Sequence, residues 1–202
     1  MSIGAILVAA GRGERFGGPK HGALLGGKPL WEWARHALEA GGLAEIVLVG
    51  AVPGGIAGGA RRRDSVMAGL EALRPGIEFV VIHDAARPLA GADLVARVRD
   101  RLTAGHADGV VPVLPLRDTV KRVDREVVVE TLERADLVAV QTPQGFRTET
   151  LRAAHAADDS DATDDAVLVE RLGGVVVTVP GEIHNLKITF PEDLRLAEAL
   201  LP

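Results

Sequence analysis

The chain has 202 residues, with 23 lysines and arginines against 28 aspartates and glutamates, and a net charge of −5. This length suits a single domain, residues 1–202, with a sizeable core. The acidic balance and the lack of a long basic run exclude nucleic acid as an expected partner, but not a nucleotide. The chain contains no cysteine, which rules out disulfides and thiolate metal sites.

No apolar stretch reaches the length of a bilayer, and no charged leader precedes the first apolar run. We therefore expect a cytoplasmic protein without a membrane partner.

Strand-like and helix-like segments alternate along the chain. Apolar runs predict strands over residues 3–9, 45–50, 78–83, 109–114, 137–141 and 174–179. Amphipathic segments predict helices over residues 30–40, 63–73, 92–103, 148–157, 164–172 and 191–200. This order indicates an α/β fold, a Rossmann-like, mostly parallel sheet with helices on both faces. In such sheets the ligand binds at the carboxyl ends of the strands.

The first strand leads into a glycine-rich loop over residues 9–20, AAGRGERFGGPK. Glycines let backbone amides approach an anion closely, and Arg15 and Lys20 add positive charge, so the loop predicts a phosphate-binding site. A dinucleotide fingerprint fits poorly, because Gly17 stands one residue late for the third glycine and the next strand ends in Gly50 instead of an acid.

Residues 22–29, GALLGGKP, nearly match a second phosphate motif, the P-loop. Pro29 replaces the hydroxyl that would bind the metal, and no strand precedes Gly22. We instead expect Pro29 in the first turn of the helix that runs to Ala40.

Two further strand exits carry polar residues. Residues 58–66, GGARRRDSV, fit a ligand loop, and equally a helix start capped by Asp64 or Ser65. At the other exit, HDAARP, Asp84 is a natural Mg²⁺ ligand beside a polyphosphate, and Arg87 can bind a substrate phosphate. The alternative is a capping Asp84 with a surface Arg87. We expect His83 to be a packing or hydrogen-bonding neighbour, not a base.

Residues 115–136 break the alternation. Two short alternating runs around Asp124 and Arg125 predict a β-hairpin. An isolated charged hairpin is marginally stable alone, so we expect it to be a dimerisation arm that packs on another subunit. Further on, residues 163–166, TDDA, are typical of a helix N-terminus with a cap and acids favoured by the helix dipole.

Together these motifs resemble those of the 2-C-methyl-D-erythritol 4-phosphate cytidylyltransferases, CTP-using enzymes of non-mevalonate isoprenoid synthesis. The resemblance covers nearly the whole chain and follows the order AAGRGERFGGPK, RRRDSV, HDAARP, RDTVKR, VQTPQGF, TDDA and NLKITFPEDL. It implies a nucleotidyltransferase fold, transfer of a cytidylyl group from CTP to 2-C-methyl-D-erythritol 4-phosphate, Mg²⁺ or another divalent cation as cofactor, and a homodimer.

The resemblance also implies roles for individual residues. The nucleotide-binding residues would be Ala9, Ala10, Gly11, Gly13, Lys20, Gly59, Ala60 and Ser65. The residues that bind the sugar phosphate would be Asp84, Arg87, Thr119, Arg134, Thr142 and Lys187, with Thr119 and Arg134 reaching the neighbouring subunit's substrate. The catalytic cations would be Arg15, Lys20, Arg134 and Lys187, and the metal ligand Asp84.

Three positions depart from the family pattern. His21 stands where glutamine is usual, Ala60 where an acid is frequent, and His184 where an acid is common. Two alternatives remain: a cytidylyltransferase for another polyol phosphate such as ribitol 5-phosphate, and a non-catalytic nucleotide-binding module. Retention of both Arg15 and Lys20 argues against the second, because binding alone needs neither cation aimed at the α-phosphate.

Overall fold

A computed structural model describes residues 1–18 and 20–201 of the chain. Its centre is a mostly parallel sheet in the order β11-β6-β10-β5-β1-β4, with β9 paired to the outer part of β6. The strands are β1 (Ile3–Val8), β4 (Glu45–Val49), β5 (Phe79–Asp84), β6 (Gly109–Pro115), β9 (Val138–Val140), β10 (Gln144–Arg147) and β11 (Val176–Pro180).

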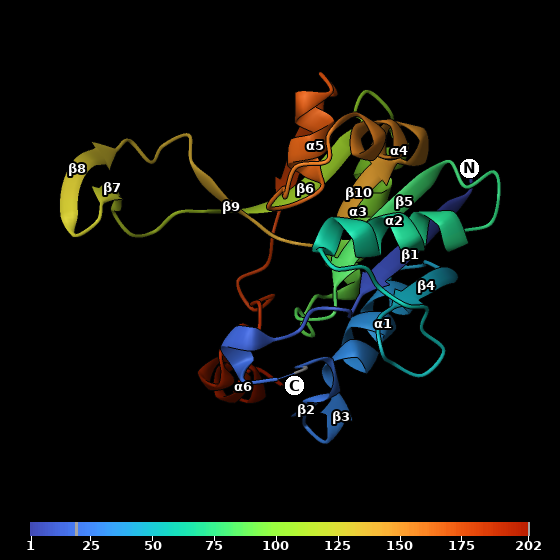
Figure 1. Cartoon of the computed structure of the whole chain (residues 1–202), viewed down its shortest axis with the longest axis horizontal. Coiled ribbons are helices and arrows are strands. Elements are labelled where there is room, and N and C mark those ends of the chain that lie inside the picture. The colour runs from blue at the N-terminus through green and yellow to red at the C-terminus, as the bar shows by residue number, and fades with distance from the viewer. Residues whose placement is uncertain (19, 202) are drawn as a thin grey trace.

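Helices cover both faces of this sheet (Figure 1), as the sequence predicts. They are α1 (Leu30–Ala40), α2 (Arg62–Ala72), α3 (Ala92–Thr103), α4 (Thr148–Ala157), α5 (Ala166–Arg171) and α6 (Pro191–Glu198). Two buried clusters show the two-sided packing. On one face Ile6 and Ile82 pack with Leu70 of α2, and on the other Leu7 and Val81 pack with α1 and α3 side chains. Successive side chains of β1 and β5 thus point to opposite faces, which explains why both strands are continuously apolar.

The register of the parallel strands places their ends together. β1 pairs with β4 on one side and with β5 on the other, and Val8 lies opposite both Val49 and Asp84. The loops that follow Val8, Val49 and Asp84 therefore leave the same edge of the sheet.

The observed strands differ from the predicted ones at two informative places. The expected strand 137–141 is shortened to exposed β9, which joins the sheet only by pairing antiparallel with the C-terminal end of β6. An unpredicted strand, β10, lies between β5 and β6 and runs antiparallel to both. Its Phe146 is fully buried, and Gly145 leaves room for Val98 and Leu102 of α3, so core packing outweighs its short polar sequence.

The segment that resembles a P-loop is a small hairpin. Strands β2 (Leu24–Leu25) and β3 (Lys28–Pro29) flank Gly26 and Gly27, both of which have positive φ. Such a two-glycine turn closes a tight hairpin and offers no strand-to-helix phosphate loop. Helix α1 starts directly after Pro29, and the side chain of Lys28 lies over the ring of Trp33 at 4.5 Å.

The predicted arm extends away from the body of the molecule (Figure 1). Strands β7 (Val120–Asp124) and β8 (Val127–Leu132) pair only with each other, and Arg125 in their turn has a φ of 53°. Val123, Val127 and Val128 are all more than half exposed. Across the described residues, no helix has both the length and the apolar character that a membrane span requires.

Candidate active site

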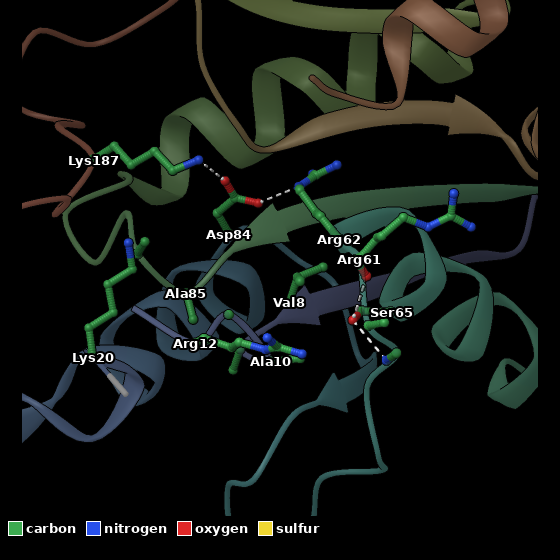
Figure 2. A pocket seen from close by; sticks show the side chains of 15 residues that line it. Val8, Ala10, Arg12, Lys20, Arg61, Arg62, Ser65, Asp84, Ala85 and Lys187 are labelled. Carbon is green, nitrogen blue, oxygen red and sulfur yellow. Dashed lines mark hydrogen bonds and ion pairs between the residues drawn. The ribbon is translucent and has the colours of Figure 1, made fainter. Parts of the chain in front are cut away.

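A cavity of about 190 Å³ lies at the carboxyl ends of β1 and β5. Most residues predicted for the nucleotide line it, together with two of those predicted for the second substrate: Ala9, Ala10, Gly11, Lys20, Gly59, Ala60, Ser65, Asp84 and Lys187. In the view of Figure 2, Lys20 and Lys187 approach from one end, Ser65 lies at the other, and Asp84 stands between them.

The glycine-rich loop presents unpaired backbone donors at the rim of this cavity. Within the described residues, the amides of Ala10, Gly11 and Arg12 make no hydrogen bond to the protein. Gly13 turns the chain with a φ of 66°, and a Cβ there would lie 1.9 Å from the carbonyl oxygen of Gly18. The chain then enters the short 3₁₀ turn η1 (Glu14–Phe16). Consecutive free amides of this kind form an anion-binding concavity.

Lys20 begins the next 3₁₀ turn, η2 (Lys20–Gly22), and its side chain is held in place. Its Nζ donates to the carbonyl oxygen of Ile188 at 2.8 Å. Burial, followed by the positive charge of Lys187, lowers the pKa of Lys20. This ammonium group is therefore partly desolvated, and an anion bound in the cavity would offset the free-energy cost of that desolvation.

Asp84 is the carboxylate at the centre of the cavity, and both of its oxygens are paired. Lys187 Nζ donates to its Oδ2 at 2.8 Å, and Arg62 Nε donates to its Oδ1 at 3.1 Å. Burial alone would raise the pKa of Asp84, but Arg62 and Lys187 outweigh it and hold that pKa far below the ordinary value. Asp84 is thus ionised at every physiological pH.

The backbone beside Ser65 is packed too closely for side chains. A Cβ on Gly58 would lie 2.3 Å from that of Ala10, and a Cβ on Gly59 would lie 2.2 Å from that of Asp64. The amide of Gly59 donates to Ser65 Oγ at 3.1 Å. The N-cap residue of α2 is Arg61, and neither predicted residue takes that position. Asp64 lies in the first turn and accepts from the backbone amide of Arg61 at 3.0 Å, whereas Ser65 holds the loop.

His83 and Thr142 fix the backbone of Asp84 through a short hydrogen-bonded network. His83 Nε2 lies 3.2 Å from the carbonyl oxygen of Arg87, which can only accept, so Nε2 carries the proton and Nδ1 accepts from the Thr142 hydroxyl at 3.0 Å. The same hydroxyl accepts from the amide of Asp84 at 3.1 Å. Burial lowers the pKa of His83 to about 4. The ring is thus a neutral hydrogen-bonding neighbour.

Other predicted residues lie outside the cavity lining. The guanidinium of Arg15 is exposed and lies over the ring of Phe190, 5.8 Å from its centroid. Arg87 donates to the carbonyl oxygen of Asn185 at 2.8 Å. Thr119 precedes β7, and Arg134 follows β8 and donates to the carbonyl oxygen of Arg117, so both belong to the arm. The side chain of His21 and all of Pro19 lie outside the described residues.

Sequence reasoning missed three cations that line the cavity, Arg12, Arg61 and Arg62. Arg62 belongs to the run of three arginines, but the sequence does not indicate which of them faces the ligand. The structure separates them: Arg61 pairs with Asp64 and Asp159, while Arg63 is buried against carbonyl groups that follow α4. Arg12 follows Gly11 in the loop and forms no ion pair within the described part of the chain.

A divalent cation would find one protein carboxylate here. The described residues contain no group of three or more histidines or acids placed to bind a metal. Mg²⁺ commonly uses one or two carboxylates together with substrate phosphates, so Asp84 fits as a single ligand if it exchanges one of its cationic partners.

Comparisons with known proteins agree with this geometry. The chain matches the family model described as IspD: 2-C-methyl-D-erythritol 4-phosphate cytidylyltransferase over residues 3–202. A protein of that name from Frankia casuarinae is 47% identical over 216 residues, which cover 98% of this chain and 81% of the relative. A bifunctional enzyme IspD/IspF from Solidesulfovibrio magneticus is 47% identical over 233 residues, with 100% of this chain and 58% of the relative covered.

Among solved structures, the 2-C-methyl-D-erythritol 4-phosphate cytidylyltransferase of Thermus thermophilus is 40% identical and superposes with a TM-score of 0.85. The match covers 99% of this chain and 98% of that one. On its sequence, fold and cavity, the chain belongs to the IspD family of cytidylyltransferases.

Proposed function

We propose that this chain transfers the cytidylyl group of CTP to 2-C-methyl-D-erythritol 4-phosphate in isoprenoid precursor synthesis. A phosphate oxygen of the sugar attacks the α-phosphorus of CTP and forms the new P–O bond. The bond from that phosphorus to the β-phosphate oxygen breaks, and pyrophosphate leaves. The observation that carries this proposal is a cavity in which unpaired loop amides and several cations surround one ionised carboxylate.

The loop and Lys20 act on the nucleotide. The amides of Ala10, Gly11 and Arg12 point to the triphosphate, and Lys20 and Arg15 stabilise the charge that gathers on the α-phosphate as bonds form and break. Arg15 must leave Phe190 to reach that position. Because the acceptor phosphate is itself the nucleophile, the protein supplies position and positive charge and needs no nucleophile of its own.

The cytosine and ribose occupy the end of the cavity formed by Gly59, Ala60 and Ser65. Ala60 offers no carboxylate, so base selection depends on backbone groups and on the close packing of this segment.

The acceptor phosphate lies against Lys187 and Arg87, while Thr142 and Asp84 set its approach. Lys187 is already aimed by its ion pair with Asp84. Arg134 and Thr119 reach the site of a second subunit across a homodimer formed by the arm, residues 115–136. The exposed valines of β7 and β8 support this proposal, since they would be covered in a dimer.

Mg²⁺, held by Asp84 and phosphate oxygens, would neutralise triphosphate charge when bound. Asp84→Asn should raise the Mg²⁺ concentration that gives half-maximal activity. An unchanged Mg²⁺ titration would assign the metal to phosphate oxygens alone. We also propose that the protein acts in the cytoplasm, where CTP is available.

Product analysis tests the proposed reaction. The purified protein is incubated with CTP and either 2-C-methyl-D-erythritol 4-phosphate or ribitol 5-phosphate, and the nucleotides are separated by HPLC. We expect a new cytidine diphosphate product with the first acceptor. A larger kcat/KM with ribitol 5-phosphate would favour the other polyol reaction, and CTP binding without product would favour a non-catalytic module.

A further inference from the structure

Asp165 is a buried carboxylate that the proposed reaction does not use. The sequence predicts a helix N-terminus at residues 163–166, and α5 begins there at Ala166. The hydrogen bond to its first turn comes from Asp164, whose Oδ1 accepts from the amide of Val167 at 3.1 Å. Asp165 directly precedes α5, but its side chain makes no capping hydrogen bond. It is only 1% exposed, so its charge needs partners within the protein.

Two partners hold Asp165 there. His155 of α4 lies with Nε2 3.0 Å from Asp165 Oδ1, and Arg62 donates from Nη1 to Asp165 Oδ2 at 2.7 Å. Burial would raise the pKa of Asp165, but Arg62 and His155 keep it below its ordinary value, so the group is an anion.

Arg62 connects this buried anion to the cavity. Its Nε donates to Asp84 Oδ1 while its Nη1 donates to Asp165, so one planar guanidinium spans two carboxylates. A chain of charged side chains therefore runs from Asp165 through Arg62 and Asp84 to Lys187 at the cavity rim (Figure 2 shows the last three), and His155 of α4 lies at its buried end.

The geometry points to a specific consequence for Asp84. Arginine binds a carboxylate best through two parallel hydrogen bonds, and here only Nε reaches Asp84, because the bond from Nη1 to Asp165 fixes the orientation of the guanidinium. Its Nη2 is buried and has no hydrogen-bond partner among the described residues. Asp84 Oδ2 is thereby left for Lys187. Without the charge on Asp165, Arg62 is expected to take both oxygens of Asp84 and displace Lys187.

We infer that Asp165 is a positioning residue for the transfer reaction. Through Arg62 it keeps one oxygen of Asp84 paired with Arg62 and the other with Lys187, and this second pair aims Lys187 at the acceptor phosphate. This inference rests on the proposed role of Lys187. Asp165 itself touches neither substrate, since it is not among the residues that line the cavity.

The test uses Asp165→Asn, which keeps the shape and removes the charge. We expect kcat/KM for 2-C-methyl-D-erythritol 4-phosphate to fall about 10- to 100-fold, as for a misplaced reacting group. The dissociation constant for CTP, measured by calorimetry without acceptor, should stay within about three-fold, because the loop amides and Lys20 are untouched. Equal losses for both ligands, or no loss for the acceptor, would overturn the inference.

Two further variants separate positioning from folding. Asp158 lies in the loop between α4 and α5, and its carboxylate pairs with Arg171 and not with Arg62. Asp158→Asn is therefore expected to leave unchanged both kcat/KM for the acceptor and the dissociation constant for CTP. Arg62→Lys replaces a group that spans two carboxylates by one that cannot, and should show the same split between acceptor and CTP. Arg62→Lys alone tests the inference if Asp165→Asn does not fold.

The double variant Arg62→Lys with Asp165→Asn tests the path. If Asp165 acts through Arg62, the double variant should be about as impaired as Arg62→Lys alone, whereas additive losses would overturn the inference. Wild-type turnover in the same assay is the check on the proposed function: if the wild-type enzyme makes no product, that function fails, independently of the charge chain.

Discussion

Removal of the Lys20 ammonium group gives the sharpest test of the cavity's electrostatics. Lys20 is half-buried, and its Nζ is fixed by the carbonyl oxygen of Ile188 beside the glycine-rich loop. Two unit charges about 4 Å apart interact by about 4 kcal/mol at an effective dielectric constant of about 20. Loss of one preorganised donor to a transition state costs about 100- to 1,000-fold in turnover. Lys20→Ala should therefore lower kcat by about two to three orders of magnitude.

The assay is pyrophosphate release at saturating CTP and acceptor, with Lys28→Ala as the matched control. Lys28 lies over Trp33 and is absent from the cavity lining, so its removal should leave kcat within a few-fold of wild type. A kcat for Lys20→Ala that stays within a few-fold of wild type would refute the role of Lys20. An equal loss in Lys28→Ala would restore the P-loop interpretation that the hairpin argues against.

Three other perturbations have defined outcomes. His83 has a pKa of about 4 in the folded protein and about 6.5 in the unfolded chain, so the unfolded state binds more protons between these pH values. The free energy of unfolding should therefore fall by up to about 3 kcal/mol as the pH drops from 6.5 to 4. Urea titrations should show this fall in His36→Gln and not in His83→Gln, and a fall in both would exclude His83 as its source. Gly11→Ala should leave the melting temperature unchanged, since its Cβ would meet nothing within 4 Å, yet weaken CTP binding by calorimetry; unweakened binding would place the triphosphate elsewhere. Finally, the Lys20→Ala and Arg134→Ala variants can be unfolded and refolded as a mixture. If Arg134 acts in the partner subunit, about a quarter of the sites in the mixture should regain wild-type activity. Activity that remains at the level of the separate variants, despite confirmed subunit exchange, would place Arg134 in its own site.

The sheet was predictable because its strands are buried on both faces. Runs such as those of β1 and β5 are apolar at nearly every position, and the helices between them carry one apolar face, so local pattern and tertiary packing agree. β10 was not predictable in this way. Its four residues lie in the centre of the sheet because the ring of Phe146 is buried there and because Gly145 is small enough to pack against α3. Both contacts are made with elements distant in sequence, so the local pattern does not indicate them.

The candidate site was predictable where it depends on the ends of strands. The glycine-rich loop and Asp84 meet because β1 and β5 are adjacent and parallel, as expected for this fold class. The partners of Asp84 could not be read from the pattern alone. Arg62 is one of three consecutive arginines, and only the direction of α2 decides which of them crosses to Asp84 and Asp165.

The central claim is transfer from CTP to a sugar phosphate without a protein nucleophile, and pyrophosphate release tests it most directly. The wild-type protein is incubated with Mg²⁺ and CTP, with and without 2-C-methyl-D-erythritol 4-phosphate. The account predicts pyrophosphate in equal amount to the cytidine diphosphate product when the acceptor is present, and none with CTP alone. Pyrophosphate from CTP alone, or its absence with both substrates, would contradict the account.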